Sequence, residues 1–303
     1  MSNYDNCTLC PRRCGVDRSA GQLGFCRQPA QLRLAKAMLH FGEEPPLSGS
    51  FGTGAVFFSG CTLRCSFCQN AEISTGGKGM AVTPARLREI FEELIDRGAQ
   101  SIDLVTPTHF LPDILPALTP KLPVPVIYNC GGYESVERLR RLEGLVDIYL
   151  PDLKYADNSL AKQLSAAPDY FETACAAIME MYRQVGGAVY NEDGEMTRGM
   201  IVRHLVLPAQ LDNTLCVLDW LAEAFPKRDV PISLMSQYVP VGRQDPPFDR
   251  AITAEEYDGA LSWMELLGLT NGFVQDGSAA TTEYLPRFDF EGVEKKENKC
   301  LHF

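Results

Sequence analysis

The chain has 303 residues, 45% of them hydrophobic, and a formal net charge of −11 at pH 7. This length allows one large domain or two ordinary ones, and the apolar fraction is sufficient for a buried core. The acidic balance argues against a large nucleic-acid-binding face, which would be basic, so we expect no nucleic-acid partner.

Membrane insertion and secretion are also unexpected. No apolar run approaches the roughly 18 residues that a membrane helix needs, and residues 1–13 lack the apolar stretch of a signal peptide. We therefore expect a cytoplasmic protein, in which the eleven cysteines are more naturally metal ligands than disulfide partners. Seven of the eleven lie before position 69, in two tight groups.

The first group of cysteines lies in an N-terminal segment that we place at residues 1–45. A C-x2-C-P-x2-C-x11-C pattern supplies four potential ligands, Cys7, Cys10, Cys14 and Cys26. Zinc bound by all four thiolates would hold together a segment too small to bury a core. A second, fully ligated [4Fe–4S] cluster could use the same residues and relay electrons. Both alternatives remain open.

A stretch rich in proline, glycine and serine follows at residues 44–54 and is typical of a loop. Beyond it, apolar segments of strand length alternate with amphipathic helical stretches. We predict helices beginning at Thr83 and covering 170–185, 214–224 and 254–267. Strands are predicted at 55–58, 101–105, 124–128, 146–150, 200–206 and 232–235, with a further short strand at 272–275.

Repeated strand–helix units predict an α/β fold with a parallel sheet and helices outside it. Six clear units are fewer than the eight of a closed barrel. We therefore predict a partial (β/α)6 TIM-like barrel at residues 46–290, with the cysteine-rich segment before it and a C-terminal tail at residues 291–303. In such barrels the chemistry takes place at the carboxyl ends of the strands, where the polar motifs of this chain lie.

The second group of cysteines, Cys61, Cys65 and Cys68, directly follows the predicted strand at 55–58. Their thiolates can converge only if the backbone curls around a metal. A cubic [4Fe–4S] cluster normally has four thiolate ligands, so three cysteines leave one iron open to a chelating group. S-adenosylmethionine (SAM) is such a chelator, through its amino and carboxylate groups. The alternative is a zinc site completed by a histidine or a fourth cysteine, which the x3 spacing suits less well.

This C-x3-C-x2-C spacing, with Phe67 before the third cysteine, resembles the signature of radical SAM enzymes. Gly60 and the pair Gln69-Asn70 make it similar to the branch that includes pyruvate formate-lyase activating enzyme. The N-terminal cysteines narrow the resemblance to a group of activating-enzyme homologues. Over nearly the whole chain, the resemblance implies a six-unit partial barrel, a [4Fe–4S] cluster and SAM, with Phe67 packing over the adenine. Ordinary core packing is the alternative for Phe67.

The motif after the second predicted strand departs from the family pattern. Many relatives carry Gly-Gly-Glu there, whereas this chain has Thr-Pro-Thr-His at residues 106–109. The resemblance therefore leaves contact with the cofactor amino group to backbone carbonyls or to the Thr108 hydroxyl. His109 could move a proton or could simply cap the loop. Tyr238, after the sixth strand, stands where relatives contact adenine, and a core tyrosine is the alternative.

Two charged motifs resemble cofactor contacts of the family. Asp152 and Lys154 match its Asp-Leu-Lys motif, and on an extended segment they face the same way; the alternative is a surface ion pair of little value. Arg203 and Leu205 match its Arg-x-Val-x-x-Pro pattern. A guanidinium inside a barrel needs an anion, either the cofactor carboxylate or a barrel carboxylate. Leu205 would pack on the adenine.

A monovalent cation beside the cofactor is less expected. Relatives have Asp-Thr where this chain has Asn129-Cys130, and those positions, with Leu150 and Asp152, can hold such an ion. The asparagine removes one negative charge from that set.

The resemblance implies an enzyme that reductively cleaves SAM to a 5′-deoxyadenosyl radical, with a flavodoxin- or ferredoxin-like electron donor. Its substrate could be a glycyl residue on a partner protein, which would make the chain an activating enzyme. The alternatives are a radical enzyme that modifies a small molecule or a peptide, and a two-cluster electron carrier without catalysis. No residue of the sequence identifies the hydrogen donor.

Overall fold

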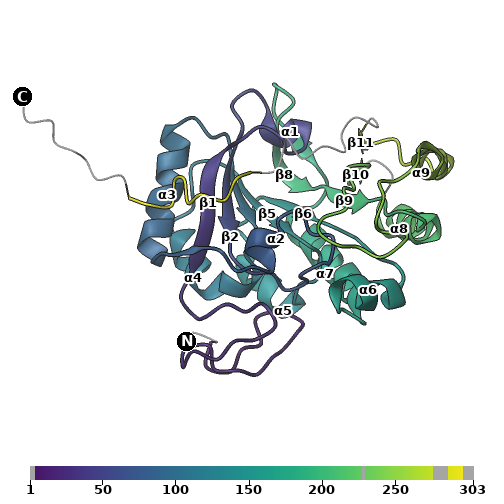
Figure 1. Cartoon of the computed structure of the whole chain (residues 1–303). Helices are drawn as coiled ribbons and strands as arrows, with labels where there is room; N and C mark the ends of the chain where they lie inside the picture. Colours follow the sequence, from purple (N-terminus) through teal and green to yellow (C-terminus); the bar gives the residue numbers. More distant parts are fainter. Residues whose placement is uncertain (1–3, 227–228, 276–285, 296–303) are drawn as a thin grey trace, which may run out of the picture.

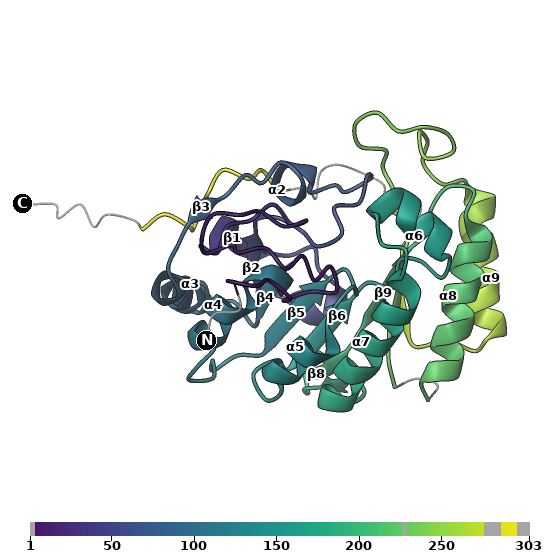
Figure 2. The same cartoon turned by 90° about the horizontal axis from the view of Figure 1, so that it is seen from below.

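A mostly parallel sheet organises the computed structural model, which describes residues 4–226, 229–275 and 286–295. Helices lie outside this sheet (Figures 1 and 2). In chain order, the elements are β1 (Arg33–His40), α1 (Pro45–Ser48), β2 (Thr53–Phe58), α2 (Ala71–Ser74), β3 (Met80–Ala81), α3 (Pro84–Asp96), β4 (Ile102–Val105), α4 (Leu111–Ala117), β5 (Val126–Cys130), α5 (Val136–Leu139), β6 (Ile148–Pro151), α6 (Asn158–Ser165), α7 (Tyr170–Val185), β7 (Val189–Tyr190), β8 (Met196–Met200), β9 (Val202–Leu205), α8 (Leu211–Ala224), β10 (Ile232–Met235), α9 (Ala254–Leu266) and β11 (Gly272–Val274).

The strand order confirms the predicted open α/β barrel. Strands β2, β4, β5, β6 and β8 are parallel neighbours, and β9, β10 and β11 form a second parallel group. Only Ile201 separates β8 from β9, and a parallel bridge between Asp152 and Arg203 joins the two groups. The path β2-β4-β5-β6-β8/β9-β10 therefore has the six parallel positions of a partial barrel, with β11 beyond them.

Strand β1 differs from expectation because it lies within the segment assigned to the N-terminal cysteines. It pairs antiparallel with β2 and so extends the sheet before residue 46. The sequence hides this strand because Lys36 interrupts its apolar residues. That lysine is buried, and its ammonium pairs with Asp289 and Glu291, both at 2.9 Å. The first residues of the predicted tail thus lie against β1, whereas residues 296–303 lie outside the described part.

Helix α3 illustrates how local sequence fixes the outer layer. The Thr83 side chain caps it by accepting a hydrogen bond from the amide of Arg86, and a proline follows at the first helical position. The apolar positions spaced along it, Leu87, Ile90, Phe91 and Leu94, are all buried against the sheet.

None of the helices in the described part is long and apolar enough to span a membrane.

The inside of the barrel is apolar near the amino ends of the strands and polar near their carboxyl ends. Ile127, Ile148 and Ile201 belong to one buried apolar cluster inside the sheet. Two residues further along their strands, Asn129 and Arg203 line a cavity at the carboxyl ends, whereas Leu150 at the same level of β6 still belongs to the apolar cluster. The change from apolar to polar places the candidate site at the end of the barrel where the sequence predicts it.

Candidate functional site

A cavity of about 230 Å³ lies at the carboxyl ends of the strands, and we call it the cluster cavity. The loop after β2 contributes all three clustered cysteines to its wall. The ends of other strands contribute the polar side chains on the opposite wall, so one cavity is lined by residues as far apart in sequence as Cys61 and Gln237. Its lining includes Cys61, Cys65, Phe67, Cys68, Gln69, Asn70, Asn129, Asp152, Lys154, Arg203, Leu205 and Gln237.

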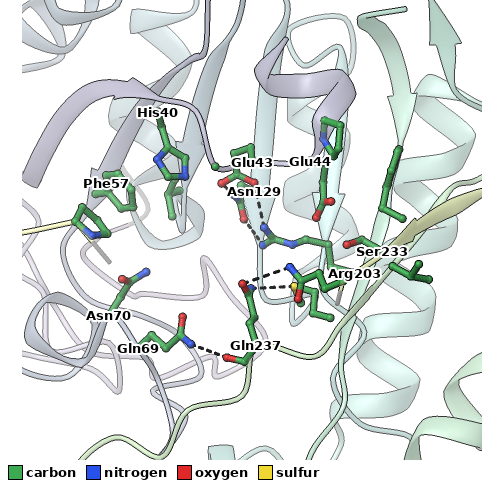
Figure 3. A pocket seen from close by; sticks show the side chains of 18 residues that line it. His40, Glu43, Glu44, Phe57, Gln69, Asn70, Asn129, Arg203, Ser233 and Gln237 are labelled. Atoms are coloured by element: carbon green, nitrogen blue, oxygen red, sulfur yellow. Dashed lines mark hydrogen bonds and ion pairs between the residues drawn. The ribbon is translucent and has the colours of Figure 1, made fainter. Parts of the chain in front are cut away.

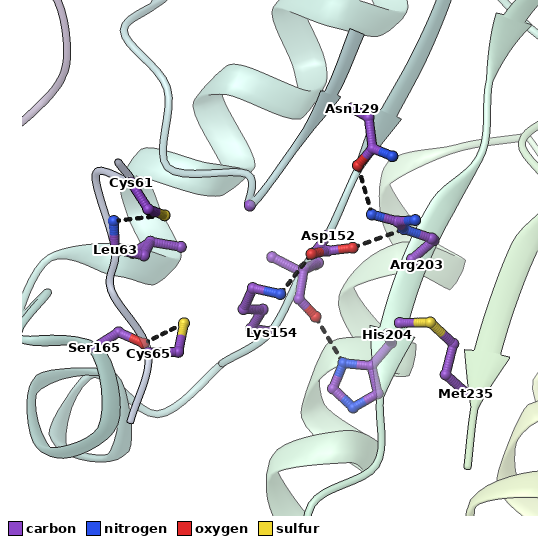
Figure 4. A network of polar contacts seen from close by, with 12 residues as sticks. Cys61, Leu63, Cys65, Asn129, Asp152, Lys154, Ser165, Arg203, His204 and Met235 are labelled. Carbon is purple, nitrogen blue, oxygen red and sulfur yellow. Dashed lines mark hydrogen bonds and ion pairs between the residues drawn. The ribbon is translucent and has the colours of Figure 1, made fainter. Parts of the chain in front are cut away.

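Backbone geometry brings the three thiols to this wall. The loop enters through Gly60, whose φ of +84° favours glycine, and a Cβ there would lie 2.8 Å from the carbonyl oxygen of Cys26. The sulfur atoms accept hydrogen bonds from the Leu63 amide to Cys61 (3.3 Å), from the Ser165 hydroxyl to Cys65 (3.0 Å; Figure 4) and from the Ser74 hydroxyl to Cys68 (3.3 Å).

These thiols require a positive partner in order to ionise. Burial, together with the nearby thiolates of Cys65 and Cys68, raises the pKa of Cys61 to about 12. Burial and Cys65 likewise raise the pKa of Cys68. Iron would remove this penalty by coordinating the thiolates. Three thiols line one cavity, and each sulfur accepts a hydrogen bond. This arrangement therefore fits a cluster bound by three cysteines.

The same side chains fit a single metal ion less well. Within the residues that the structure describes, no group of three or more His, Cys, Asp or Glu side chains is arranged around one ion. In a cubic cluster each thiolate binds a different iron, so the sulfurs do not have to meet at one point.

A buried ion network forms the wall opposite the cysteines (Figure 4). Arg203 donates from Nε to Asp152 Oδ1 (2.8 Å), from Nη2 to Asn129 Oδ1 (2.7 Å) and from Nη1 to Glu43 Oε2 (3.3 Å). Lys154 pairs with the other oxygen of Asp152. Burial alone would raise the pKa of Asp152, but the Arg203 and Lys154 charges outweigh it and hold that pKa below its usual value.

These contacts give Arg203 a barrel carboxylate, Asp152, as its anionic partner. Leu205 lines the same cavity, as predicted from its position two residues along the strand. His204 faces outward: its Nδ1 lies 2.6 Å from the Leu153 carbonyl and its Nε2 lies 2.9 Å from the Thr214 hydroxyl of α8. Burial lowers the pKa of His204 to about 4, so the ring is neutral and structural.

Thr108 and Tyr238 stand behind the cavity wall rather than in it. The Thr108 hydroxyl is buried and donates to Glu134 (2.6 Å). The Tyr238 hydroxyl donates to the Phe248 carbonyl (2.7 Å), and its ring packs on Phe67 with centroids 5.7 Å apart. Phe67 itself faces the cavity. In this arrangement Tyr238 acts as a support for Phe67, while any role in cofactor binding stays a prediction.

His109 is also removed from the cavity. It is 1% exposed, and its Nε2 lies 2.6 Å from the Ser59 carbonyl. Burial and the nearby Arg18 charge lower the pKa of His109 to about 3. These contacts are those of a histidine that ties the loop after β4 to the end of β2.

The segment that carries the N-terminal cysteines is irregular coil, drawn in dark purple beside one end of the sheet (Figure 1). Burial raises the pKa of Cys10 and of Cys26, and each is raised further by the charges of other cysteines in the group. Arg18, 1% exposed, lies 3.8 Å from the sulfur of Cys7 and donates to the His109 carbonyl (2.7 Å). Cys10 and Cys26 thus lie near other thiols of the group, and Arg18 holds this segment against the barrel.

The sequence did not identify the carboxylates of Glu43 and Glu44 as part of a site. They line a second cavity, beside the first, and behind them lies the fully buried Asp103 of β4. Glu43 and Glu44 occur in a stretch whose prolines and glycines indicate a loop. The one feature of the sequence that could have indicated this site was Asp103, because a carboxylate is unexpected inside the apolar strand predicted at 101–105.

Comparison with known proteins finds a family match in the central part of the chain. Residues 55–191 match the model of the Radical SAM superfamily. An uncharacterized protein of Methanocaldococcus jannaschii, MJ0674, is 29% identical over 280 residues, which cover 88% of this chain and 76% of that protein.

Two solved structures are more distantly similar. SuiB of Streptococcus suis has a TM-score of 0.48 and 12% identity, covering 74% of this chain and 48% of SuiB. Methylornithine synthase, PylB, has a TM-score of 0.47 and 14% identity, covering 77% of this chain and 75% of PylB. The matched region therefore spans just under half of SuiB. A likeness at this level carries no functional inference.

Proposed function

We propose that this protein, which contains a Radical SAM superfamily domain at residues 55–191, is a radical SAM enzyme. Cys61, Cys65 and Cys68 would bind three irons of a [4Fe–4S] cluster and leave the fourth for SAM. The observation that carries this proposal is the cluster cavity, which has three hydrogen-bonded thiols on one wall and a buried ion network on the other.

When bound, the cluster and SAM supply a one-electron cleavage of the sulfonium S–C5′ bond, which releases methionine and a 5′-deoxyadenosyl radical that takes a hydrogen atom from the substrate. The products of that transfer are 5′-deoxyadenosine and a substrate radical. The electron has to come from outside the chain, and we propose a flavodoxin- or ferredoxin-like donor.

The residues of the cavity suit the parts of SAM in different ways. Lys154 has a single carboxylate partner, so its ammonium has donors left for the cofactor carboxylate. Phe67 and Leu205 give the cavity apolar surface, on which we place the adenine. Arg203, which already has three acceptors, would hold Asp152 in position rather than bind the cofactor directly.

The test is anaerobic reconstitution followed by dithionite and SAM, with 5′-deoxyadenosine measured by chromatography. The wild type should form it, whereas Cys65→Ser should form none because the cluster loses one of three thiolates. Cys216→Ser, at an exposed cysteine outside the cavity, is the matched control and should retain full activity. Iron reduction with intact SAM in the wild type would indicate the electron carrier instead, and cleavage by Cys65→Ser would refute the site.

Two kinds of hydrogen donor are consistent with this chemistry. The resemblance to activating enzymes supports a glycyl residue on a partner protein. The size of the neighbouring cavity, about 370 Å³, favours a small molecule or one peptide side chain. An activating enzyme would generate a glycyl radical signal in electron paramagnetic resonance (EPR) spectra of its partner, whereas a modifying enzyme would change the mass of its substrate.

For the N-terminal segment we propose a second metal site at Cys7, Cys10, Cys14 and Cys26. Its support is the burial of Cys10 and Cys26, which raises the pKa of both thiols, and the charges of other cysteines of the motif that act on them. Zinc and a fully ligated [4Fe–4S] cluster both match four thiolates in number, and neither leaves an open coordination position. Among the described residues these thiols, like those of the cluster cavity, are not arranged around a single ion, so zinc would require them to move closer together.

A further inference from the structure

Beside the cluster cavity lies a second cavity of about 370 Å³, which we call the acidic chamber (Figure 3). The loop between β1 and α1 supplies Glu43 and Glu44 to its wall, and β10 supplies Ser233. The two cavities share several lining residues, among them Asn129, Arg203 and Gln237. A molecule in the acidic chamber would therefore lie directly beside the space proposed for SAM.

Carboxylates outnumber cations in this region. Asp152, Glu43, Glu44 and Asp103 all act on Arg203 electrostatically, whereas the second cation, Lys154, is engaged with Asp152. Among the described side chains that line the chamber, Arg203 carries the only fixed positive charge; His40 is the other basic group in the wall.

Asp103 adds to the acidic character of this region from behind the chamber wall. Its side chain is fully buried, Oδ2 accepts a 3.3 Å hydrogen bond from Asn129, and Oδ1 receives no N–H donor among the described residues, while the carboxyl of Glu43 is close enough to share a proton with it. Burial and the neighbouring Glu43 raise the pKa of Asp103 well above its usual value. Burial also raises the pKa of Glu44 even though the Arg203 charge opposes it. A buried carboxylate with an unpaired oxygen is costly unless a donor reaches it.

Arg203 is not free to offset this excess or to bind an anion. Each of its three nitrogens already donates a hydrogen bond, to Asp152, Asn129 and Glu43, and two of these partners are carboxylates that balance its charge. An anionic substrate group in the chamber would meet two carboxylates and no available cation. A group that donates hydrogen bonds and carries a positive charge would complete the set.

We propose that the acidic chamber binds a primary ammonium or guanidinium group of the hydrogen-donor substrate, with Glu43 and Glu44 as its acceptors. This inference rests on the proposed function, because it takes the neighbouring cluster cavity as the place of hydrogen transfer. The recognised chemistry is a cationic group on an aliphatic chain, carried either by a free amine or guanidine or by a lysine or arginine side chain of a peptide.

The test measures binding to the anaerobically reconstituted protein with SAM by calorimetry. Butylguanidinium should bind saturably and its neutral analogue butylurea should not. Glu43→Gln and Glu44→Gln should each weaken butylguanidinium binding by about tenfold or more, since each removes a charged acceptor. Glu265→Gln, an exposed carboxylate on α9, is the matched control and should bind like the wild type. Acetylated tripeptides with a central Lys or Arg, compared with pentylammonium, distinguish the two sources of the cation.

Three results would overturn the proposal: equal binding of butylurea, wild-type affinity in both glutamine variants, or complete displacement by potassium ions at constant ionic strength. The wild-type comparison of the two analogues needs no variant, so it stands even if a substitution impairs folding. Formation of 5′-deoxyadenosine by the wild type is measured separately. Cleavage of SAM without binding of butylguanidinium would refute only the cation site in the acidic chamber. Binding of butylguanidinium without cleavage of SAM would refute only the proposed function.

Discussion

Ser165 offers a direct way to perturb the cluster without touching a ligand. It is the last residue of α6, 2% exposed, and its hydroxyl donates to the sulfur of Cys65 at 3.0 Å. The Tyr155 hydroxyl lies 2.7 Å from the Ser165 oxygen, so the two hydroxyls form a chain that ends on the thiolate. This bond stabilises the reduced cluster more than the oxidised one because reduction adds negative charge at the sulfur.

Ser165→Ala should therefore lower the reduction potential of the cluster. A hydrogen bond to a charged group contributes about 1.5–3 kcal/mol, and roughly half of that should differ between the two redox states. A tenfold change in a one-electron equilibrium, about 1.4 kcal/mol, corresponds to about 59 mV, so we expect a fall of about 30–60 mV.

The assay is a mediated redox titration of the reconstituted protein, followed by EPR. Ser159→Ala is the matched control, because this serine is exposed on the same helix and its potential should equal that of the wild type. Iron content establishes that each variant carries the same cluster. Equal potentials for Ser165→Ala and Ser159→Ala would refute the reasoning.

Two other predictions concern Glu134 and the N-terminal cysteines. Burial raises the pKa of Glu134 to about 7 in the folded protein, whereas its pKa in the unfolded chain is about 4. Protonation of Glu134 therefore stabilises the fold fully below about pH 4, and this stabilisation is lost as the pH rises through 7. In urea unfolding, the free energy of unfolding of Glu134→Gln should rise by about 3 kcal/mol relative to that of the wild type between pH 4.5 and pH 8. A difference between the two proteins that does not change with pH would contradict this prediction. Cys10→Ser should lose either one zinc or about four irons, and unchanged metal content would refute the N-terminal site.

The order of strands and helices was largely predictable because apolar runs of strand length alternate with helical periodicity. The buried positions of α3, for example, follow directly from the spacing of Leu87, Ile90 and Phe91. β1 was not predictable from such local patterns. Its Lys36 is stable in the sheet only because acidic residues about 250 positions later reach it.

The site was predictable where residue spacing alone decides the geometry. The loop that brings Cys61, Cys65 and Cys68 to one cavity needs no distant partner to be recognised. The partner of Arg203 was not predictable, because Glu43 lies 160 residues away in an apparent loop. Thr108 failed to reach the cavity for a related reason: its hydroxyl meets Glu134, a residue of another strand–helix connection.

Arg12 links the two cysteine groups and gives a physical reason for their presence in one chain. Its guanidinium donates to the carbonyls of Thr62 (2.8 Å) and Ser165 (2.7 Å), and it stacks on the ring of Phe25 with 3.8 Å between Cζ and the centroid. Thr62 follows the first cluster cysteine, and Ser165 donates to the second. Arg12 itself lies between two N-terminal cysteines, so a metal there would fix its position. A second metal site would thereby hold the cluster loop against the barrel, whether or not it carries electrons.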